Sequence, residues 1–407
     1  MKLRSQHIRY LYNTLFFILF CFTISSCTEQ YAFKTSTFEN ILVVQANITN
    51  EYKKQEIKIS RSYRFEESGP TTEEGATVFV TDNDNNSYSF SLEKTSGLYV
   101  SNNEFQAIPG KTYQLNITTK EGKSYSSSVQ SLTPVNEIQV EPKIETKDGK
   151  KGVQIVVSSY DPNAKTKFYR YEYDETYKVV AQSWTPYKLV LAPFTTNGRP
   201  DFIVVPREGE SRICFTTKKS DDLLLMNTVG SSEDRINLPI RFISAKDPII
   251  KERYSIIVRQ YVQNLESYTY YKTLKSLSTS ESIFSQVQPG FNYGNLKSND
   301  NSSEKIIGFF EVSSISSKRI FFSYRDIFID EPYPPYPSEC AYESYKNCWG
   351  QTEDRSCRGE KILSIVNGPG LDVLYYGTDK DSFVFITAAC TDCTKISSNI
   401  KPLFWID

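Results

Sequence analysis

The chain has 407 residues, in which 47 lysines and arginines nearly balance 48 aspartates and glutamates, and His7 is the only histidine. The first 26 residues read as a leader. Their removal takes away His7 and three basic residues, so 44 positive side chains (47 less 3) remain against 48 negative ones. A body without histidine excludes Ser-His-Asp catalysis, Cys-His catalysis and histidine-ligated zinc. Its slight acidity gives no support to nucleic-acid binding, which favours basic surfaces. We expect no cofactor and no metal.

The leader has the pattern of a lipoprotein signal peptide. Basic residues precede the apolar run from Leu15 to Phe22, which is too short to span a membrane as a helix. The run leads into Ile24-Ser25-Ser26-Cys27, with isoleucine where a lipoprotein box usually has leucine. We therefore expect residues 1–26 to be removed, Cys27 to carry lipid and residues 27–38 to form a polar tether. The alternatives are an ordinary signal with an incidental cysteine, and an uncleaved anchor helix.

Residues 39–134 are predicted to form an antiparallel β-sandwich of the immunoglobulin or transthyretin type. Turn residues such as those of Asp82–Asn86 separate short runs of strand-forming residues. The order of glycines and tyrosines is similar to that of transthyretin-type and carboxypeptidase-regulatory-type sandwiches, in which Tyr99 and Tyr113 would fill the core. The predicted strands are Ile41–Ile48, Gln55–Ser60, Ala76–Val80, Ser87–Leu92, Gly97–Val100, Thr112–Thr118 and Ser124–Val129.

Residues 152–407 are predicted to form a second, larger β-rich domain with one or a few short helices. Residues 134–151, which are charged and contain two prolines, read as the linker or the domain edge. One helix is expected over Leu265–Leu277, with Asn264 as its N-cap and an apolar stripe at every third residue. Predicted strands are Gly152–Ser158, Phe168–Val180, Arg253–Val262, Lys305–Val312 and Arg319–Tyr324, followed by an irregular, cysteine-rich final third. The fold class is therefore all-β and mainly antiparallel.

The strand Phe168–Val180 alternates between tyrosines and a row of charged residues, Arg170, Glu172 and Asp174. We expect the tyrosine face to pack on the core and the charged face to lie in water. The alternative is that the charged row is a binding face.

The segment Asp330–Pro337 contains four prolines and two tyrosines, Tyr333 and Tyr336. Four prolines exclude a central strand. Rigid tyrosine-proline segments suit contact surfaces, because tyrosine offers a large contact area at low entropic cost. We treat Tyr333 and Tyr336 as a candidate contact loop; the alternative is a structural loop held by the neighbouring Cys340.

Six cysteines remain after Cys21 leaves with the leader and Cys27 takes lipid. An even number in a secreted chain predicts disulfides, and we expect at least two among the cysteines of residues 340–393. The sequence leaves the pairing open. Alternatives are a cysteine-ligated zinc site and a redox motif at Cys390-x-x-Cys393. The disulfide candidates are Cys214, Cys340, Cys348, Cys357, Cys390 and Cys393.

A series of short phrases runs along nearly the whole body: Leu42-Val43-Val44, Asn47-Ile48-Thr49-Asn50-Glu51, Ile57-x-Ile59-Ser60-Arg61-Ser62, Gly75-Ala76-x-Val78, Asp161-Pro162, Phe168-Tyr169-Arg170-Tyr171, Ser282-Ile283-Phe284, Gln288-Pro289, Gly294-Asn295, Ile307-Gly308-Phe309-Phe310, Cys390-x-x-Cys393 and Pro402-x-Phe404-Trp405. In their order these phrases resemble a Bacteroidota-type family of outer-membrane lipoproteins, domain of unknown function 4249. One departure is Gln45-Ala46, where Glu-Gly is common in the family.

The resemblance implies a cell-envelope protein, often encoded near TonB-dependent transporters, and it transfers no catalytic residue. We therefore expect a non-enzymatic protein anchored by lipid in the outer membrane, on either its periplasmic or its cell-surface face. As an accessory to a TonB-dependent transporter, it would act in nutrient capture or envelope assembly, with a glycan or a peptide as ligand. One alternative is a surface hydrolase of glycosidase type, with Asp161, Glu172, Asp174, Asp330 and Glu331 as the carboxylates to consider. The other is a structural or adhesive module.

Overall fold

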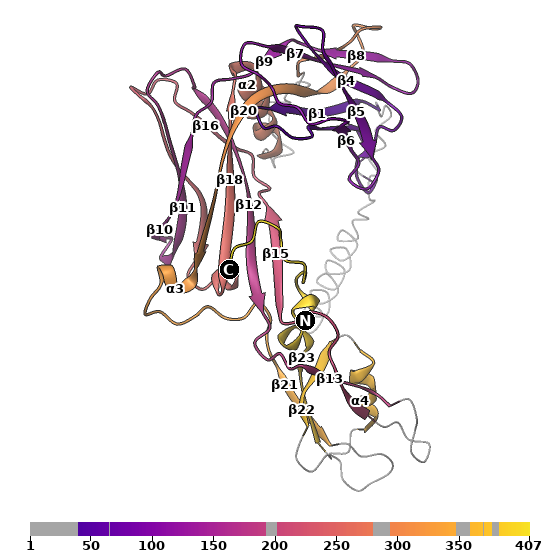
Figure 1. Ribbon diagram of the computed structural model, residues 1–407, viewed down its shortest axis with the longest axis vertical. Coiled ribbons are helices and arrows are strands. Elements are labelled where there is room, and N and C mark those ends of the chain that lie inside the picture. Colours follow the sequence, from indigo (N-terminus) through magenta and orange to yellow (C-terminus); the bar gives the residue numbers. More distant parts are fainter. Residues whose placement is uncertain are drawn as a thin grey trace, which may run out of the picture.

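The computed structural model describes residues 40–64, 66–192, 202–279, 294–346, 359–368, 370–376 and 382–407. Figure 1 shows three parts, which we call the N-terminal lobe (upper right), the central sandwich (left) and the small lobe (bottom). The leader and Cys27 lie outside the described residues. Within the described residues, no helix is both long enough and apolar enough to cross a membrane.

The N-terminal lobe is a mainly antiparallel β-structure built around one hydrophobic core. Tyr99 and Tyr113 lie in that core, which confirms their expected role. The predicted strands all form, with their ends shifted by a few residues at most. They are β1 (Leu42–Thr49), β2 (Glu56–Arg61), β3 (Thr71–Thr72), β4 (Thr77–Asp82), β5 (Ser87–Glu93), β6 (Leu98–Ser101), β7 (Thr112–Thr118), β8 (Ser124–Ser127) and β9 (Gln130–Ser131), to which β19 (Leu296–Ser298) adds at the edge beside β8.

The central sandwich packs two sheets face to face around a second core. One sheet has the order β10-β11-β17, and the other contains β15, β12, β18 and β20. The residues expected as a linker, 134–151, mostly form the hairpin of β10 and β11. Pro142 is tolerated there because β10 is an edge strand. The strands are β10 (Ile138–Lys147), β11 (Lys150–Asp161), β12 (Phe168–Val180), β15 (Ile213–Lys219), β16 (Leu224–Asn227), β17 (Asp234–Ser244) and β18 (Arg253–Gln263).

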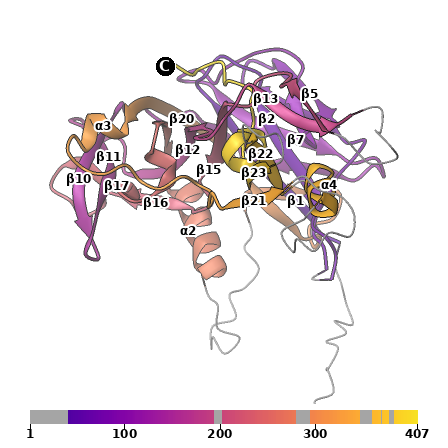
Figure 2. The same cartoon turned by 90° about the horizontal axis from the view of Figure 1, so that it is seen from below.

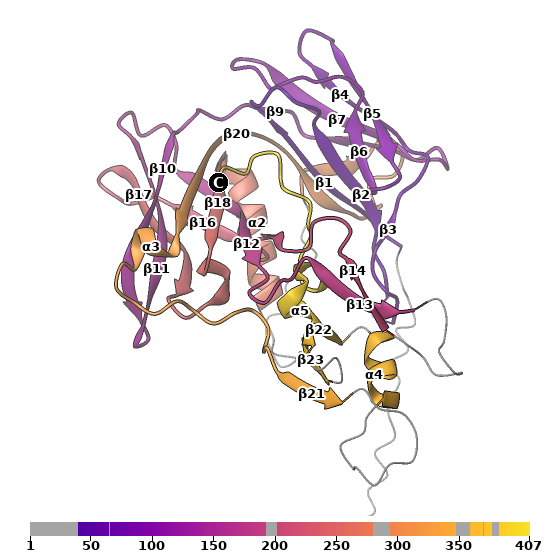
Figure 3. The same ribbon diagram turned by 60° about the horizontal axis from the view of Figure 1, so that its bottom comes forward.

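One long strand, β20 (Ile306–Ser323), belongs to both of these parts. Its first half pairs in parallel with β1, and its second half pairs antiparallel with β18. Figure 3 shows it arching from the central sandwich into the N-terminal lobe. The sequence predicts two strands here because the serines near residue 315 suggest a break. Ser313, Ser314 and Ser316 are instead buried, and Ser314 donates its hydroxyl to the carbonyl oxygen of Pro134 at 2.6 Å.

The helix α2 (Leu265–Thr279) follows β18 and packs against β12, β16 and β20 (Figure 2). Asn264 is its N-cap, as expected, because its side-chain oxygen accepts a hydrogen bond from the backbone N–H of Ser267 at 2.8 Å. The expected apolar stripe is only partly buried. Tyr268 is buried, whereas Leu265 and Leu274 are exposed. The central sandwich also contains η1 (Pro248–Ile250) and α3 (Tyr324–Ile327).

The small lobe gives regular structure to a region that the sequence leaves irregular. A third hydrophobic core joins Leu189, Ile362 and Phe385 from three of its elements. A three-stranded sheet has the order β21-β23-β22, and a hairpin of β13 and β14 lies beside it. The elements are β13 (Tyr187–Leu191), β14 (Phe202–Pro206), β21 (Tyr342–Lys346), α4 (Gly359–Val366), β22 (Leu371–Tyr376), β23 (Ser382–Thr387), α5 (Ala388–Thr391) and η2 (Cys393–Lys395). The mainly antiparallel all-β class is confirmed, with the β1–β20 pair as a parallel exception.

Two glycines and an asparagine close the N-terminal lobe against β20. Asn295 donates its side-chain amide to the carbonyl oxygen of Phe310 and accepts from the N–H of Phe310, both at 2.8 Å. The Asn295 side chain thus makes the two backbone hydrogen bonds that a neighbouring strand would otherwise make with Phe310. A Cβ at Gly294 would lie 1.4 Å from the carbonyl oxygen of Gly308, and one at Gly308 would lie 2.1 Å from that of Val44. Both glycines are required by close backbone approach.

We expect Gly308→Ala to destabilise the protein by about 2 kcal/mol or more, because the methyl group overlaps backbone and φ at this position is +144°. Gly370→Ala is the control, since a Cβ there would meet nothing within 4 Å. Thermal unfolding followed by circular dichroism measures both. Equal melting temperatures for the two variants would show that the contact between β1 and β20 tolerates a side chain.

Candidate functional site

On the charged face of β12, the side chain of Arg170 is buried. The expectation of a solvated face is wrong there, because the side chain is only 5% exposed. β12 lies inside the sheet between β15 and β18, and α2 covers this part of its surface. The opposite face behaves as expected, with Tyr169 and Tyr171 in the core of the central sandwich.

The guanidinium of Arg170 lies between two carboxylates and two aromatic rings. Its Nη1 donates to Glu172, and its Nη2 donates to Oε2 of Glu311 at 3.4 Å. Its Cζ lies 4.1 Å from the ring centre of Tyr261 and 4.9 Å from that of Tyr271. Tyr261 is the cross-strand neighbour of Arg170 in β18, whereas Tyr271 comes from α2. The Nε atom is buried and has no hydrogen-bond partner among the described residues.

Glu311 is held in place from two sides. Its Oε1 accepts hydrogen bonds from the Ser267 hydroxyl at 2.7 Å and from the Gln263 amide at 3.0 Å. Both donors lie where β18 meets α2, so the capped start of the helix fixes the carboxylate of β20. Glu311 thereby keeps one oxygen, Oε2, for Arg170.

The charges of this cluster follow from its burial and its neighbours. Burial alone would lower the pKa of Arg170, but interactions with Tyr271, Glu311 and Glu172 outweigh it and raise that pKa. Burial raises the pKa of Tyr261 and of Tyr271. At neutral pH the guanidinium is therefore charged and both phenols are neutral.

A cavity of about 410 Å³ lies beside Arg170, between the central sandwich and the outer face of β1 and β2. This volume falls within the range of small-molecule sites, about 300–1,000 Å³. Aromatic rings of α2 and β20 form one wall, with the ring centres of Tyr270 and Phe309 5.2 Å apart. Polar side chains of the N-terminal lobe also line the cavity, among them Gln45 and Lys58, which lie in one row with Phe309 across β20, β1 and β2.

Sequence reasoning finds Arg170 and Glu172 on one strand face but misses their partners. Tyr261, Tyr271 and Glu311 come from three other elements, and the pairing of β12, β18, α2 and β20 brings them together. The one available signal was Glu311 itself, a lone acid inside an otherwise apolar and serine-rich stretch.

The other carboxylates considered for hydrolysis are dispersed. Asp161 caps the turn after β11, and hydrogen bonds from that turn outweigh its burial and lower its pKa. Asp174 pairs with Arg259 at 2.8 Å, Glu331 pairs with Lys151, and Asp330 is exposed.

The candidate contact loop lines a larger groove of about 640 Å³, together with Lys150 and Lys246. Tyr333 is 52% exposed, and the guanidinium of Arg325 lies 4.2 Å from its ring centre. Tyr336 is buried, and its hydroxyl donates to the carbonyl oxygen of Ala389 at 2.7 Å. A partner at this loop would therefore touch Tyr333, while Tyr336 holds the loop to the small lobe.

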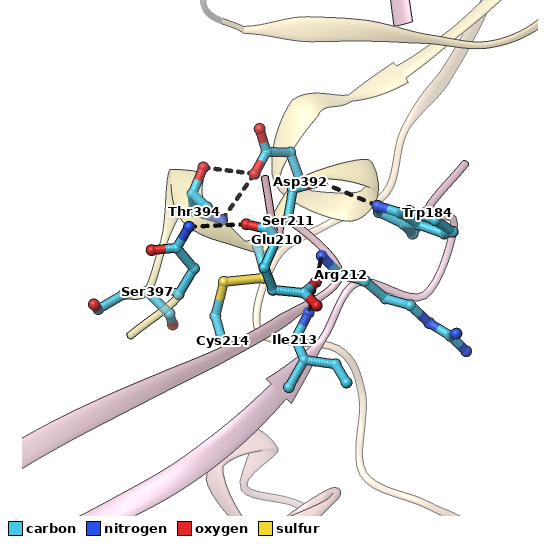
Figure 4. The surroundings of a disulfide bond; sticks show 12 residues. Trp184, Glu210, Ser211, Arg212, Ile213, Cys214, Asp392, Thr394 and Ser397 are labelled. Atoms are coloured by element: carbon cyan, nitrogen blue, oxygen red, sulfur yellow. Dashed lines mark hydrogen bonds between the residues drawn. A yellow bond between two sulfur atoms is a disulfide. The ribbon is translucent and has the colours of Figure 1, made fainter. Parts of the chain in front are cut away.

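Two disulfides tie the small lobe to the rest of the protein. Cys214 of β15 joins Cys393, and Cys340 joins Cys390 of α5. Figure 4 shows the first beside Trp184, whose indole N–H donates to the Ser211 hydroxyl at 3.0 Å. The two cysteines of the C-x-x-C motif thus have different partners, which contradicts the zinc and redox alternatives.

Only one of these disulfides, Cys340–Cys390, has both ends within residues 340–393. A second one inside that segment would involve Cys348 and Cys357, which lie outside the described residues. Among the described residues, no group of histidine, cysteine and acidic side chains is arranged to hold a metal ion.

A family model described as "Domain of unknown function (DUF4249)" matches residues 28–319. No curated protein is similar enough to the chain to match. Among solved structures, "Biofilm associated protein - BSP domain" is similar at 8% identity and a TM-score of 0.16, over 72% of this chain and 62% of that one, less than two thirds of its length. "Biofilm associated protein - B domain" is similar at 8% identity and a TM-score of 0.14, over 68% and 85% of the two chains. Similarities this weak carry no argument.

Mapping of disulfide-linked peptides without reduction should recover Cys214 with Cys393 and Cys340 with Cys390. The serine pair C214S/C393S should destabilise the protein by about 5 kcal/mol and C340S/C390S by about 4, because the first bond closes the longer loop of the unfolded chain. Denaturant unfolding under non-reducing conditions gives both values. Recovery of a peptide linking Cys390 to Cys393 would contradict this pairing.

Proposed function

The chain belongs to the DUF4249 family, and on that premise we propose that it is a lipid-anchored, non-enzymatic protein of the outer membrane. It acts as an accessory to a TonB-dependent transporter, in nutrient capture or envelope assembly. The lipoprotein-type sequence that ends at Cys27 supports the anchor, and the disulfides support a location outside the cytoplasm.

The observation that carries the binding role is the cavity at Arg170. A buried guanidinium is held in one orientation by Glu172 and Glu311, and its Nε donor has no hydrogen-bond partner in the part of the chain that the structure describes. Fixed polar groups among aromatic walls are typical of small-molecule sites. A purely structural or adhesive role gives no reason to retain such a donor, since an unmade buried hydrogen bond costs about 1–3 kcal/mol.

The same geometry argues against hydrolysis. Two carboxylates, Glu172 and Glu311, do meet beside aromatic rings, but the guanidinium of Arg170 lies between them and binds both. A glycosidase needs that space for the scissile bond. The arrangement therefore supports a binding protein.

Cys27→Ala should move the protein from the membrane fraction to the soluble fraction without unfolding it, because the tether loses its lipid. Cys21→Ala is the matched control, since Cys21 lies in the leader and leaves with it. Ultracentrifugation with immunoblotting, together with labelling by a fatty-acid analogue, measures the outcome. A Cys27→Ala protein that still sediments with membranes would overturn the anchor.

Crosslinking in intact cells, followed by detergent extraction and purification of the full-length protein, should recover a TonB-dependent transporter. Tyr333→Ala should lower that recovery severalfold, because Tyr333 presents the exposed ring of the contact loop. Tyr187→Ala is the control, with a similar exposed fraction of 53% against 52%. Recovery of the uncrosslinked protein alone would contradict the accessory role, and an equal effect of the two variants would remove the loop from it.

A further inference from the structure

We propose that the Arg170 cavity binds a neutral carbohydrate ring. This inference rests on the proposed role in ligand capture and names the class of ligand. Three properties of the cavity lead to it: a guanidinium donor held in one orientation, a near balance of charge, and aromatic rings beside polar side chains.

The donor is the guanidinium of Arg170, which carries five N–H groups. Glu172 and Glu311 each accept one of them, from Nη1 and Nη2, and the rings of Tyr261 and Tyr271 hold the guanidinium plane. Each Nη therefore keeps a second N–H that the two carboxylates do not use. A ligand oxygen at the wall of the cavity can accept a hydrogen bond from one of these N–H groups.

The charge around the cavity favours a neutral ligand. Arg170 and Lys58 oppose Glu56, Glu172 and the buried Glu311. Because positive and negative side chains nearly balance, the cavity offers no net charge that would favour a strongly charged cation or anion as ligand. A hydroxyl group suits it well, because a hydroxyl donates to a carboxylate and accepts from a guanidinium or an ammonium group.

The walls favour a ring with one apolar face. Tyr270 and Tyr271 lie with their ring centres 5.4 Å apart on α2, and Tyr270 lies 5.2 Å from Phe309. Sugar rings present C–H groups on their faces and hydroxyl groups at their edges. The rings of Tyr270 and Phe309 can stack on the face, while Gln45 and Lys58, in one row with Phe309 across β20, β1 and β2, can reach the hydroxyl edge.

The test uses the full-length, detergent-solubilised lipoprotein. Saturation-transfer NMR and isothermal titration are carried out with glucose, galactose, mannose, maltose and cellobiose as neutral probes, and with glucosamine and galacturonate as charged ones. We expect at least one neutral sugar to bind, and to bind more tightly than either charged sugar. Binding of none of the neutral probes, or preference for a charged one, would overturn the proposal.

Two variant pairs locate the binding. Tyr270→Ala should weaken the affinity about tenfold or more, whereas Tyr270→Phe should keep it, since the ring rather than the hydroxyl is used. Arg170→Lys should weaken it similarly, because an ammonium group lacks the planar set of five donors that bonds both carboxylates and the ligand. Arg235→Lys should leave it unchanged, although Arg235 also pairs with a carboxylate and stacks on a ring, at the surface. Thermal melts establish that each variant is folded.

The outcomes separate this inference from the proposed function. Sugar binding that survives both Tyr270→Ala and Arg170→Lys places the ligand elsewhere and rejects the cavity. Absence of sugar binding with intact membrane anchoring and transporter recovery rejects the ligand class alone. If no transporter is recovered by crosslinking while the protein still binds sugar, the accessory role is rejected and the assignment of the cavity as a sugar site is kept.

Discussion

The structure depends on the sharing of one strand between two cores. β20 pairs with β1 in the N-terminal lobe and with β18 in the central sandwich, so neither sheet is complete without it. At the first contact the backbones approach so closely that only glycine fits at Gly294 and Gly308. Asn295 closes the same corner with two hydrogen bonds to Phe310. The two parts are therefore joined by continuous backbone pairing rather than by a linker.

The candidate site follows from this arrangement. The parallel register of β1 and β20 sets Gln45 beside Phe309 and Asn47 beside Glu311, while β18 sets Tyr261 opposite Arg170. A buried arginine without a carboxylate partner would be costly, so Glu172 and Glu311 must come into contact with Arg170 as the chain folds. The cavity lies where the N-terminal lobe, α2 and the central sandwich meet. A change in how these three pack would alter its walls directly.

The sequence predicted more of the N-terminal lobe than of the rest. Short alternating strands between turn residues are local signals, and Tyr99 and Tyr113 occupy the core as expected. The Asn264 cap is equally local and is confirmed. The linker and the break in β20 are wrong for one reason. Prolines and serines are typical of turns and strand ends. An edge strand nevertheless tolerates Pro142, and buried hydrogen bonds satisfy serines such as Ser314.

By itself, the sequence determined the β-rich class, the family and the presence of paired cysteines, because composition, alternation and the order of short phrases are properties of the chain. It also placed Arg170 and Glu172 on one face of a strand. Only the tertiary structure decided that Arg170 on this face is buried, that Glu311 reaches it from β20, and that Cys390 and Cys393 have separate partners. These facts depend on which distant strands pair, and long-range pairing is set by the packing of whole sheets rather than by any local pattern.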